Sequence, residues 1–350
     1  MIYVDIQSYR YLCAKREVGV WIMDNIFFSI VCPMYNASAT IRRTIISILN
    51  QSFSNWELVL IDDGSADSTK EHCKSFLDTR IHYYYQDNKG PSVARDNGTK
   101  KCSGDYIIFL DSDDYLQENA LAILNKYICD YNPEIVFFQE NYEIDGKIST
   151  HSLTEIDKIE LLDTNKKIIN RCYLHKNWGF GQCGGCFQAE LFKMQTIRKT
   201  DIKYRYCEDI LNGYFLLKQA TRVLLIPDII YTYVKNSNSI THSLNGSDIF
   251  GQFVIFDYVF SDILTQNGIE KERIKYSFDG GLAGALVKYI KQGAKKDDYN
   301  TYKSRIKIIR TSKLFVDYLF EYHFDSRATM LNMKLLKYRC IFLLYLINRI

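Results

Sequence analysis

Residues 105–114, DYIIFLDSDD, join a short apolar run to three aspartates. The run Tyr106–Leu110 is uncharged and too short for an ordinary helix, which predicts a strand buried on both faces. Asp111, Asp113 and Asp114 follow it directly. Carboxylates this close together repel one another unless a cation lies among them. The stretch therefore predicts a buried strand that ends in an oxygen-rich, outward-facing cluster.

Apolar bursts and helical patterns alternate on both sides of this stretch, from Phe27 onward. Strands that alternate with helices of about 10–15 residues indicate an α/β fold with a mostly parallel sheet covered on both faces. The expected strands are 27–32, 57–61, 81–85, 106–110 and 135–138, and the expected helices are 39–51, 66–77, 91–101 and 117–131.

Polar clusters follow three of the expected strands. The first strand ends in Pro33–Asn36 (PMYN), the second in Asp62–Asp67 (DDGSAD) and the fourth in Asp111–Asp114 (DSDD). Parallel strands end at the same edge of their sheet, and ligands of open α/β sheets bind beyond that edge. We therefore expect the three clusters to meet around one ligand.

Each acidic cluster has a structural and a functional interpretation. As structure, Asp111–Asp114 would form a solvated turn that caps the next helix, and Ser65 or Asp67 would cap the helix after the second strand. As function, Asp111–Asp114 suits a hard divalent ion, Mg²⁺ or Mn²⁺, that takes few protein ligands and completes its shell with water and phosphate. Capping does not account for Asp62 and Asp63, whose carboxylates can accept hydrogen bonds from a nucleobase or a ribose.

Four stretches, taken together, resemble the inverting glycosyltransferases of family 2. The resemblance is close over residues 27–120 and looser over 178–245. It implies the GT-A fold, an α/β nucleotide-diphospho-sugar transferase fold, which a helical C-terminal extension follows in this chain. The four stretches, in the family's order and spacing, are Val31–Asn36 (VCPMYN), Leu49–Asp67 (LNQSFSNWELVLIDDGSAD), Gly90–Gly98 (GPSVARDNG) and Asp105–Asp114.

The resemblance also implies roles for individual residues. One departure is Asp96, because the family commonly has asparagine after the arginine of the third motif; Asp96 either alters the charge near the nucleotide or supports the loop. The residues implied to hold the donor are the backbone of Pro33, the stacking ring of Tyr35, Asp62 or Asp63 at the base or ribose, Arg95 at the nucleotide, Asp111 near the ribose and Asp113 as the direct metal ligand.

Inverting transfer needs a carboxylate that takes the proton of the acceptor hydroxyl as this hydroxyl attacks the anomeric carbon. Glu208 and Asp209 resemble the family's acidic pair, and a helical pattern over 210–218 follows them. We predict that Asp209 is this base, although the helix dipole would favour an acid here without any catalytic role. His242 either contacts the metal or the diphosphate or is an incidental loop histidine.

A glycine-rich segment, Trp178–Cys186, lies between the donor motifs and the predicted base. Trp178 and Phe180 would form an aromatic platform for the acceptor or belong to the core, and the two interpretations stay open. Cys183 and Cys186 form a CxxC pair, which suits half a zinc site or a redox pair. Without a second such pair, we expect two loop cysteines in a reducing, cytoplasmic compartment.

The predicted function is transfer of a sugar from a nucleotide-diphosphate donor, expected to be a UDP-sugar, to a hydroxyl of a glycan or a polyprenyl-linked glycan. Mn²⁺ or Mg²⁺ is the expected cofactor, and a bacterial cell-surface polysaccharide is the expected product. Two rivals are a sugar nucleotidyltransferase and a catalytically silent nucleotide-sugar-binding protein. The first lacks support because no glycine-rich, basic triphosphate loop occurs near the start.

The predicted organisation has three parts. An N-terminal extension covers 1–25, and a catalytic domain covers 26–245. Within this domain, 26–120 would bind the donor and 121–245 the acceptor and carry the base. A helical region with a basic amphipathic tail covers 246–350.

The charge of the chain is unevenly distributed. Residues 251–350 carry 17 Lys and Arg against 10 Asp and Glu, although the whole chain has a net charge of only +3. The acidic first part argues against nucleic acid as a partner. Residues 330–350 contain basic and apolar residues but no acid, in a run too short to span a bilayer. We expect this tail to lie on the inner face of the cell membrane, or else to pack on the body or a partner.

Overall fold

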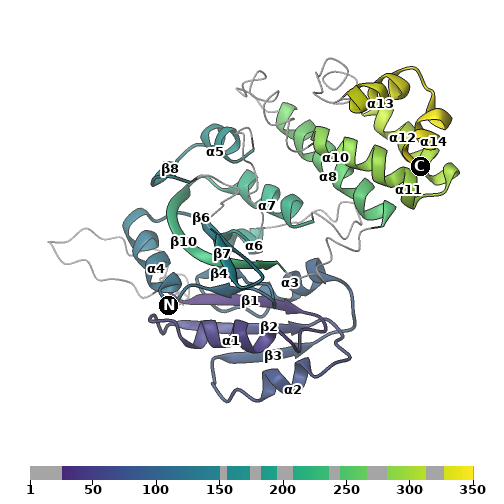
Figure 1. Cartoon of the computed structure of the whole chain (residues 1–350). Helices are drawn as coiled ribbons and strands as arrows, with labels where there is room; N and C mark the ends of the chain where they lie inside the picture. Colours follow the sequence, from purple (N-terminus) through teal and green to yellow (C-terminus); the bar gives the residue numbers. More distant parts are fainter. Residues whose placement is uncertain are drawn as a thin grey trace, which may run out of the picture.

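A mixed sheet with helices on both faces runs through the molecule (Figure 1). Its strands follow the order β3-β2-β1-β4-β9-β6-β10-β5, with β7 paired to β6 and β8 paired to β10. The structure is a computed structural model that describes residues 26–149, 156–173, 183–194, 208–235, 245–265, 282–312 and 327–349.

The first four strands form the parallel half of the sheet. β1 pairs with β2 and β4, and β2 pairs with β3, all in parallel. Pro33 is tolerated near the end of β1 because β4 pairs with β1 only as far as Val31, so the N–H that proline lacks has no ladder partner to lose. These strands are β1 (Phe28–Met34), β2 (Trp56–Asp62), β3 (Ile81–Tyr85) and β4 (Tyr106–Phe109).

Beyond β4 the strand directions are mixed. β9 lies between β4 and β6 and is antiparallel to both, whereas β6 and β10 are parallel to each other. The expectation of a mostly parallel sheet therefore holds for the first four strands, and the inserted β9 makes the second half mixed. The remaining strands are β5 (Tyr115–Leu116), β6 (Ile135–Ile144), β7 (Lys147–Ser149), β8 (Glu160–Leu162), β9 (Gly185–Gln188) and β10 (Val223–Lys235).

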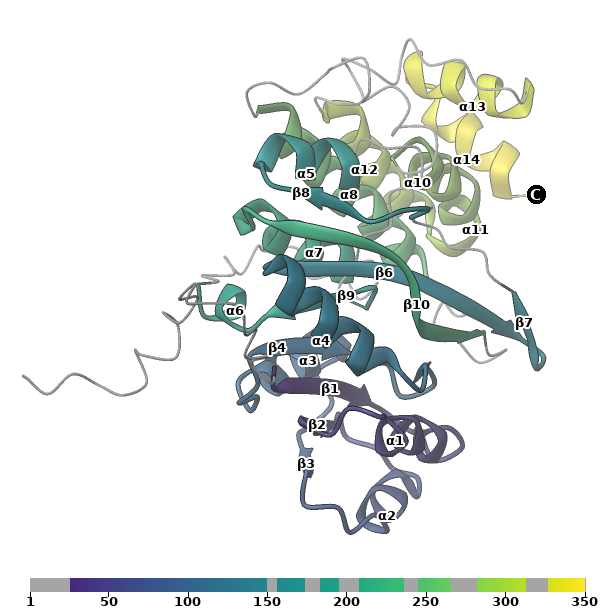
Figure 2. The ribbon, with the colours of Figure 1, turned by 90° about the vertical axis from the view of Figure 1, so that its left-hand side faces the viewer.

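Helices cover the two faces of the sheet separately. On β1, Ile30 and Cys32 belong to the core under α1 and α4, whereas Val31 belongs to the core under α3, α6 and α7. Figure 2 shows α4 and α3 on opposite sides of the sheet. These helices are α1 (Ile41–Leu49), α2 (Thr69–Lys74), α3 (Pro91–Thr99), α4 (Ala120–Tyr131), α5 (Asn165–Cys172), α6 (Glu190–Met194) and α7 (Glu208–Gln219).

The helices after β10 gather in a C-terminal lobe (Figure 1). The lobe is joined to the sheet through α7, where Tyr214 OH donates to Asp262 Oδ2 at 2.5 Å and Lys218 Nζ pairs with the same oxygen at 2.6 Å. The domain boundary near residue 245 stays a prediction, because α7 and α8 share one apolar core. The lobe contains α8 (Gly246–Thr265), α10 (Leu282–Lys288), η3 (Tyr289–Gly293), α11 (Ala294–Lys296), α12 (Tyr299–Thr311), α13 (Arg327–Lys337) and α14 (Ile341–Arg349).

Every strand and helix expected between residues 27 and 138 is present, with shifted ends. The helix expected at 66–77 starts only at Thr69, because the Asp67 carboxylate accepts hydrogen bonds from the N–H and hydroxyl of Thr69. The strand expected to end at 138 continues to Ile144, because it turns back through a tight hairpin at Asp145 and Gly146, both with positive φ.

Two helical glycines should respond oppositely to alanine. A Cβ on Gly98 would overlap the Val31 side chain, whereas one on Gly284 of α10 meets no atom within 4 Å. We expect Gly98→Ala to destabilise the fold by about 1–3 kcal/mol through overpacking, and Gly284→Ala to stabilise it by up to about 1 kcal/mol through helix propensity. Urea unfolding of the two variants checks this, and equal shifts would contradict it.

Candidate active site

The polar clusters that follow β1 and β2 form one wall, as their strand ends predict. Asp63 N donates to Met34 O at 2.8 Å, which joins the two strand ends. Asn36 N donates to Ser65 Oγ at 2.9 Å, and Ala66 N donates back to Asn36 Oδ1 at 2.9 Å. Asn36 has φ 50, a left-handed conformation that asparagine tolerates. We call this cross-linked pair of strand ends the nucleotide wall.

Asp63 ties the nucleotide wall to the start of α3. Its carboxylate accepts hydrogen bonds from Gln86 Nε2 at 2.7 Å, Lys89 N at 2.8 Å and Gly90 N at 2.8 Å. Gly90 has φ 90, which few residues other than glycine adopt, and Pro91 then occupies the first helical position. Asp63 is 4% exposed, so its carboxylate mainly holds this loop, with one of about four acceptor positions not used by these three bonds.

Asp62 and Tyr35 differ sharply in accessibility. Asp62 is 1% exposed, and its carboxylate accepts from Ser65 N at 2.8 Å and from Tyr83 OH at 2.6 Å. Tyr35 is 55% exposed, directly after β1. The ring of Tyr35 is therefore open to a planar ligand, whereas Asp62 first stabilises its own turn. The choice between Asp62 and Asp63 as the contact to the nucleotide stays open.

Asp111 is the centre of a polar network that joins four segments. Its Oδ1 accepts from Arg95 Nη2 at 2.8 Å, and its N–H donates to Tyr231 OH at 3.3 Å. The Cys183 thiol donates to Oδ2 at 3.7 Å. Burial and the charge of Asp111 raise the pKa of Cys183 well above its usual range, so the thiol stays a protonated donor.

The three aspartates after β4 do not act alike. Asp114 is 1% exposed and accepts from Tyr231 OH at 2.5 Å and from Val234 N at 2.7 Å. Burial, with the charges of Asp111 and Asp113, raises its pKa well above the usual range. The expectation of three outward carboxylates is therefore corrected: Asp114 anchors the turn to β10, whereas Asp111 and Asp113 are only half-buried.

Asp209 lies at the start of α7 and is electrostatically coupled to this network. Burial raises its pKa, the nearby Arg95 guanidinium opposes the rise, and the charge of Asp111 adds to it. A hydrogen bond from Asn212 Nδ2 to Ser92 Oγ, 3.4 Å long, holds α7 against α3. The fold thus brings Asp209 to Arg95 and Asp111, which lie far away in sequence.

Glu140 of β6 is a further acid at this place that the motifs do not include. Burial raises its pKa to about 7; a hydrogen bond with Tyr142 opposes the rise, and the charges of Asp111 and Asp209 add to it. One sequence signal was available. Glu140 closely follows the apolar run Ile135–Phe138, much as Asp111 follows the apolar run of β4.

The residues at this edge fit a divalent ion only if other ligands come with the substrate. Among the residues that the structure describes, no three His, Cys, Asp or Glu side chains are grouped to hold a metal. Mg²⁺ and Mn²⁺ commonly bind through one or two carboxylates, with phosphate and water oxygens as the other ligands. Asp113, next to Asp111 at the half-buried edge, fits an ion of this kind.

Three residues singled out by the sequence, Trp178, Phe180 and His242, lie outside the described residues. The CxxC cysteines are both free thiols. Cys183 lies in a turn, as expected, but Cys186 is a buried residue of β9. Within the described part of the chain, the pair therefore supports the Asp111 network and the sheet.

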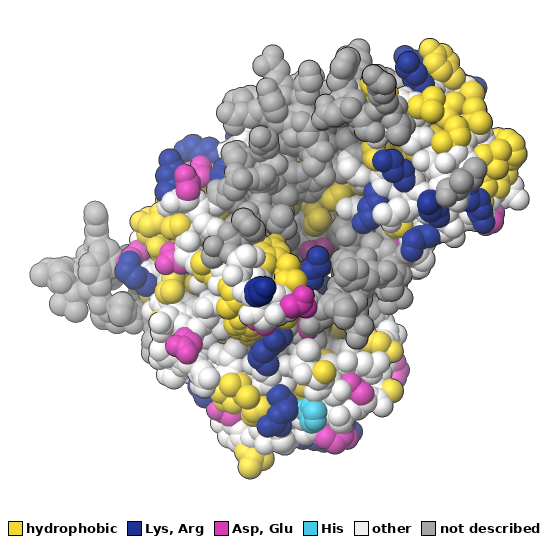
Figure 3. All heavy atoms as spheres, in the orientation of Figure 1, with side chains coloured by type: hydrophobic (Ala, Val, Ile, Leu, Met, Phe, Trp, Pro, Cys, Tyr) yellow, Lys and Arg dark blue, Asp and Glu magenta, His cyan; other side chains and the backbone are white. Residues whose placement is uncertain are grey.

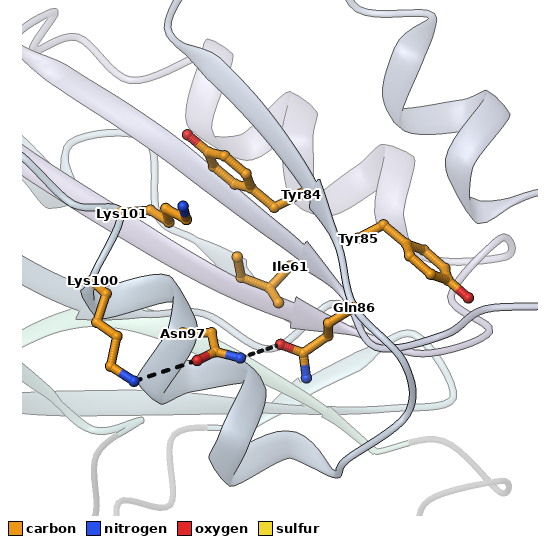
Figure 4. Close-up of a pocket in the computed structure, with 7 residues that line it drawn as sticks. All are labelled: Ile61, Tyr84, Tyr85, Gln86, Asn97, Lys100 and Lys101. Carbon is orange, nitrogen blue, oxygen red and sulfur yellow. Dashed lines mark hydrogen bonds between the residues drawn. The ribbon is translucent and has the colours of Figure 1, made fainter.

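An open pocket of about 390 Å³ lies beside the Asp63 loop (Figure 4). Asn97 Nδ2 donates to Gln86 Oε1 at 2.7 Å, and Gln86 in turn donates to Asp63. The lining residues include none of the predicted nucleotide or metal ligands. The pocket borders the loop behind the nucleotide wall, whereas the carboxylates converge elsewhere, so we take the carboxylate edge as the candidate active site.

Comparisons with known proteins agree with the motifs. Residues 29–193 match the model of the family Glycosyl transferase family 2. Over 109 residues the chain is 38% identical to Glycosyltransferase GlyA of Streptococcus pneumoniae, covering 31% of this chain and 16% of that protein. Over 123 residues it is 41% identical to the Escherichia coli UDP-Glc:alpha-D-GlcNAc-diphosphoundecaprenol beta-1,3-glucosyltransferase WfgD, covering 35% of this chain and 48% of that protein. Both matches span less than half of the relative.

A comparison of folds finds a solved structure that is similar over most of this chain. S. aureus TarS 1-349 in complex with UDP-GlcNAc matches with a TM-score of 0.65 and 18% sequence identity, covering 91% of this chain and 90% of that one. At this identity the match speaks for the fold alone, and it confirms the predicted GT-A-type α/β architecture with C-terminal helices. By motifs, fold and family match together, residues 29–193 of this chain are a domain of glycosyl transferase family 2.

Proposed function

We propose that this protein is an inverting glycosyltransferase that uses a UDP-sugar as donor and a hydroxyl of a glycan or a polyprenyl-linked glycan as acceptor. The observation that carries the proposal is the coupling of Asp209 to Asp111 and Arg95 at the carboxyl edge of the sheet. The family 2 domain supports the class of reaction. The UDP-GlcNAc in the TarS title and the WfgD name support the donor and a lipid-linked acceptor.

The nucleotide wall is the proposed site of the nucleotide. Tyr35 would stack on the base, because its ring is exposed beside the backbone of Pro33. Asp62 or Asp63 would accept a hydrogen bond from the base or ribose through a remaining lone pair. Arg95 would place positive charge near the nucleotide, and Asp111 would contact the ribose; their ion pair holds both in position.

Asp209 is the proposed general base. As the acceptor hydroxyl attacks the anomeric carbon, Asp209 would take its proton while the bond from that carbon to the diphosphate oxygen breaks on the opposite side. Attack opposite the leaving group inverts the anomeric centre. A half-buried carboxylate suits this task, because it can be reached by the acceptor, while its partial burial raises its pKa and makes it a stronger base than an exposed aspartate.

Asp113 is the proposed ligand of a divalent ion, Mn²⁺ or Mg²⁺, whose other ligands would be diphosphate and water oxygens, with His242 as a further candidate. The ion supplies positive charge for the departing diphosphate. Arg43 Nη2 donates to Asp113 O at 2.6 Å, which holds the backbone of this residue at the edge.

Binding of nucleotide and metal should depend on each other. We expect UDP with Mn²⁺ to raise the melting temperature of the wild-type protein by a few degrees, since binding to the native state stabilises it. Excess EDTA should remove most of this shift, and Asp113→Asn should reduce it as well. Asp87→Asn, an exposed acid in a neighbouring loop, is the control and should keep it. A full response to UDP in EDTA would contradict the metal site.

The test of catalysis is Asp209→Asn. Loss of a general base should lower kcat by about 10²–10⁴-fold while UDP affinity is unchanged. In the wild type, kcat should fall at low pH as Asp209 protonates, with the fall above the usual aspartate pKa of about 3.9 because burial raises the pKa. The variant should lose this pH limb. Donor turnover between about pH 4 and pH 9 measures both.

Asp248→Asn is a matched control, because Asp248 lies in the first turn of α8 as Asp209 lies in that of α7. If both variants lose only stability and neither affects turnover, Asp209 merely supports its helix. A wild-type protein that binds UDP but transfers no sugar would leave the catalytically silent binding protein as the better description. A product with a nucleotide joined to a sugar phosphate would instead favour a nucleotidyltransferase.

We also propose that α13 and α14 contact an anionic membrane surface on the cytoplasmic side. Residues 327–349 contain no acid. Ile341 and Leu344 of α14 pack inward, whereas Phe342, Leu343, Leu346 and Ile347 are 41–58% exposed, and Lys334, Lys337 and Arg339 are exposed nearby. Figure 3 shows apolar side chains gathered on this lobe beside basic ones. Among the described helices, none is long and apolar enough to cross a membrane.

Vesicle sedimentation tests this surface. Each basic residue near an anionic surface adds about 1 kcal/mol, so Lys334→Glu with Lys337→Glu should weaken binding to phosphatidylglycerol-containing vesicles by at least about tenfold. The matched control is Lys166→Glu with Lys167→Glu, two exposed residues of α5, which changes the net charge equally and should bind normally. Equal binding to neutral vesicles would contradict the proposal. Self-association that the α14 change Phe342→Ser abolishes would assign the surface to a second copy.

A further inference from the structure

Glu140 is an acid for which the proposed mechanism has no role. It pairs in register with Tyr231 of the neighbouring strand β10. Tyr231 is the residue whose hydroxyl bonds both Asp114 and the N–H of Asp111. In the sheet order, β6 lies on the far side of β4 from the nucleotide wall. Glu140 therefore approaches the carboxylate network from the side opposite the nucleotide wall.

The surroundings of Glu140 are acidic and close-packed. The charges of Asp111 and Asp209 both act on its carboxylate, and no Lys or Arg among the described residues counters them. A Cβ on Gly184 would lie 3.1 Å from Glu140 Oε1, so the turn before β9 covers one side of the carboxylate. Only a residue without a side chain leaves this space open.

A purely structural role does not account for these surroundings. Asp63 and Asp114 are structural as well as buried, and each accepts hydrogen bonds from backbone N–H groups. Within the described residues, Tyr142 is the hydrogen-bond partner that acts on Glu140. Glu140 is only partly buried, so its carboxylate has room for a further hydrogen-bond donor, and acids with a raised pKa cluster at functional sites.

We propose that Glu140 binds a hydroxyl of the transferred sugar and thereby helps to select the donor. This inference rests on the proposed function. In a direct displacement, the sugar lies between the leaving diphosphate, near Asp111 and Asp113, and the base Asp209. Glu140 is in register with Tyr231, whose hydroxyl bonds the N–H of Asp111, and so borders this gap from the β6 side. A carboxylate accepts hydrogen bonds from hydroxyls, and a site built for such a bond discriminates strongly against a sugar that lacks it.

The test separates affinity for the sugar from affinity for the nucleotide. Titration calorimetry with Mn²⁺ would compare UDP with UDP-glucose, UDP-galactose and UDP-GlcNAc, to find the sugar that the wild-type protein prefers. Glu140→Ala should weaken that UDP-sugar by about tenfold to a hundredfold, the range for a hydrogen bond to a charged group. UDP affinity should not change, because UDP lacks the transferred sugar. Glu140→Gln keeps one acceptor oxygen, so its affinity for the UDP-sugar should lie between those of the wild type and of Glu140→Ala.

Glu143→Gln is the control on the same strand. Glu143 accepts from Tyr115 OH at 2.9 Å, lies 3.9 Å from Arg43 and pairs in register with Val234 instead of Tyr231. This variant should leave the affinities for UDP and UDP-sugar unchanged. If Glu140→Ala unfolds the protein, the near-isosteric Glu140→Gln is used instead. The test is then the ratio of its affinity for the preferred UDP-sugar to its affinity for UDP.

Two failures can be told apart. If the Glu140 variants weaken UDP and the UDP-sugar equally, or change neither, Glu140 does not bind the sugar, and the proposed transfer still stands. If the wild-type protein binds neither UDP nor any of the three UDP-sugars, the proposed function itself is overturned, and this inference with it.

Discussion

One ion pair, from the buried Arg95 Nη2 to the half-buried Asp111 Oδ1 at 2.8 Å, organises the electrostatics of the site. Arg95 is only 6% exposed, and a guanidinium stays charged at any physiological pH. Burial of this charge requires a carboxylate partner, so the position of α3 and the turn after β4 depend on each other. The same cation opposes the rise in the Asp209 pKa that burial causes. A substitution of Arg95 would therefore disturb the nucleotide wall and the base together.

The site gathers more negative charge than this one cation neutralises. The charge of Asp111 acts on Asp114, Glu140 and Asp209, and with burial it raises the pKa of each of these three acids. Fixed contacts keep the cluster together, above all the Tyr231 hydroxyl, which bonds Asp114 and the N–H of Asp111. Such an arrangement favours ligands that bring positive charge or hydroxyl donors. A divalent ion with a diphosphate sugar, as proposed here, brings both.

The second half of the sheet contributes residues that contact or lie beside the aspartates after β4. β9 enters between β4 and β6 and places the Cys183 thiol on Asp111 and the Gly184 backbone beside Glu140. β6 and β10 run side by side through the same region, so Glu140 and Tyr231 reach the aspartates that β4 delivers. The helices after β10 share a core with α7, which carries Asp209, so the C-terminal lobe also buttresses the helix of the proposed base.

The sequence by itself determined the strands and helices between residues 27 and 138, the GT-A architecture and the meeting of Asp62, Asp63 and Asp111 at one edge. The strands, the helices and their shared edge follow from local signals: short apolar runs, helical periodicity, and the rule that parallel strands end together. The GT-A architecture follows from the resemblance of four motifs to family 2. The prediction missed the two-residue strand β5 and several helix and strand ends, where the Asp67 carboxylate and a hairpin outweighed the apolar pattern. The roles of the predicted site residues stay predictions.

Only the tertiary structure decided which carboxylates are structural and which border the site. Asp111, Asp113 and Asp114 look alike in sequence, but Asp114 is bonded to Tyr231, 117 residues away. The direction of β9 and the place of Glu140 likewise depend on partners that are distant along the chain. The apolar pattern of a segment states that it is buried, but it does not state what it is buried against. That is settled when distant strands pair and share one core.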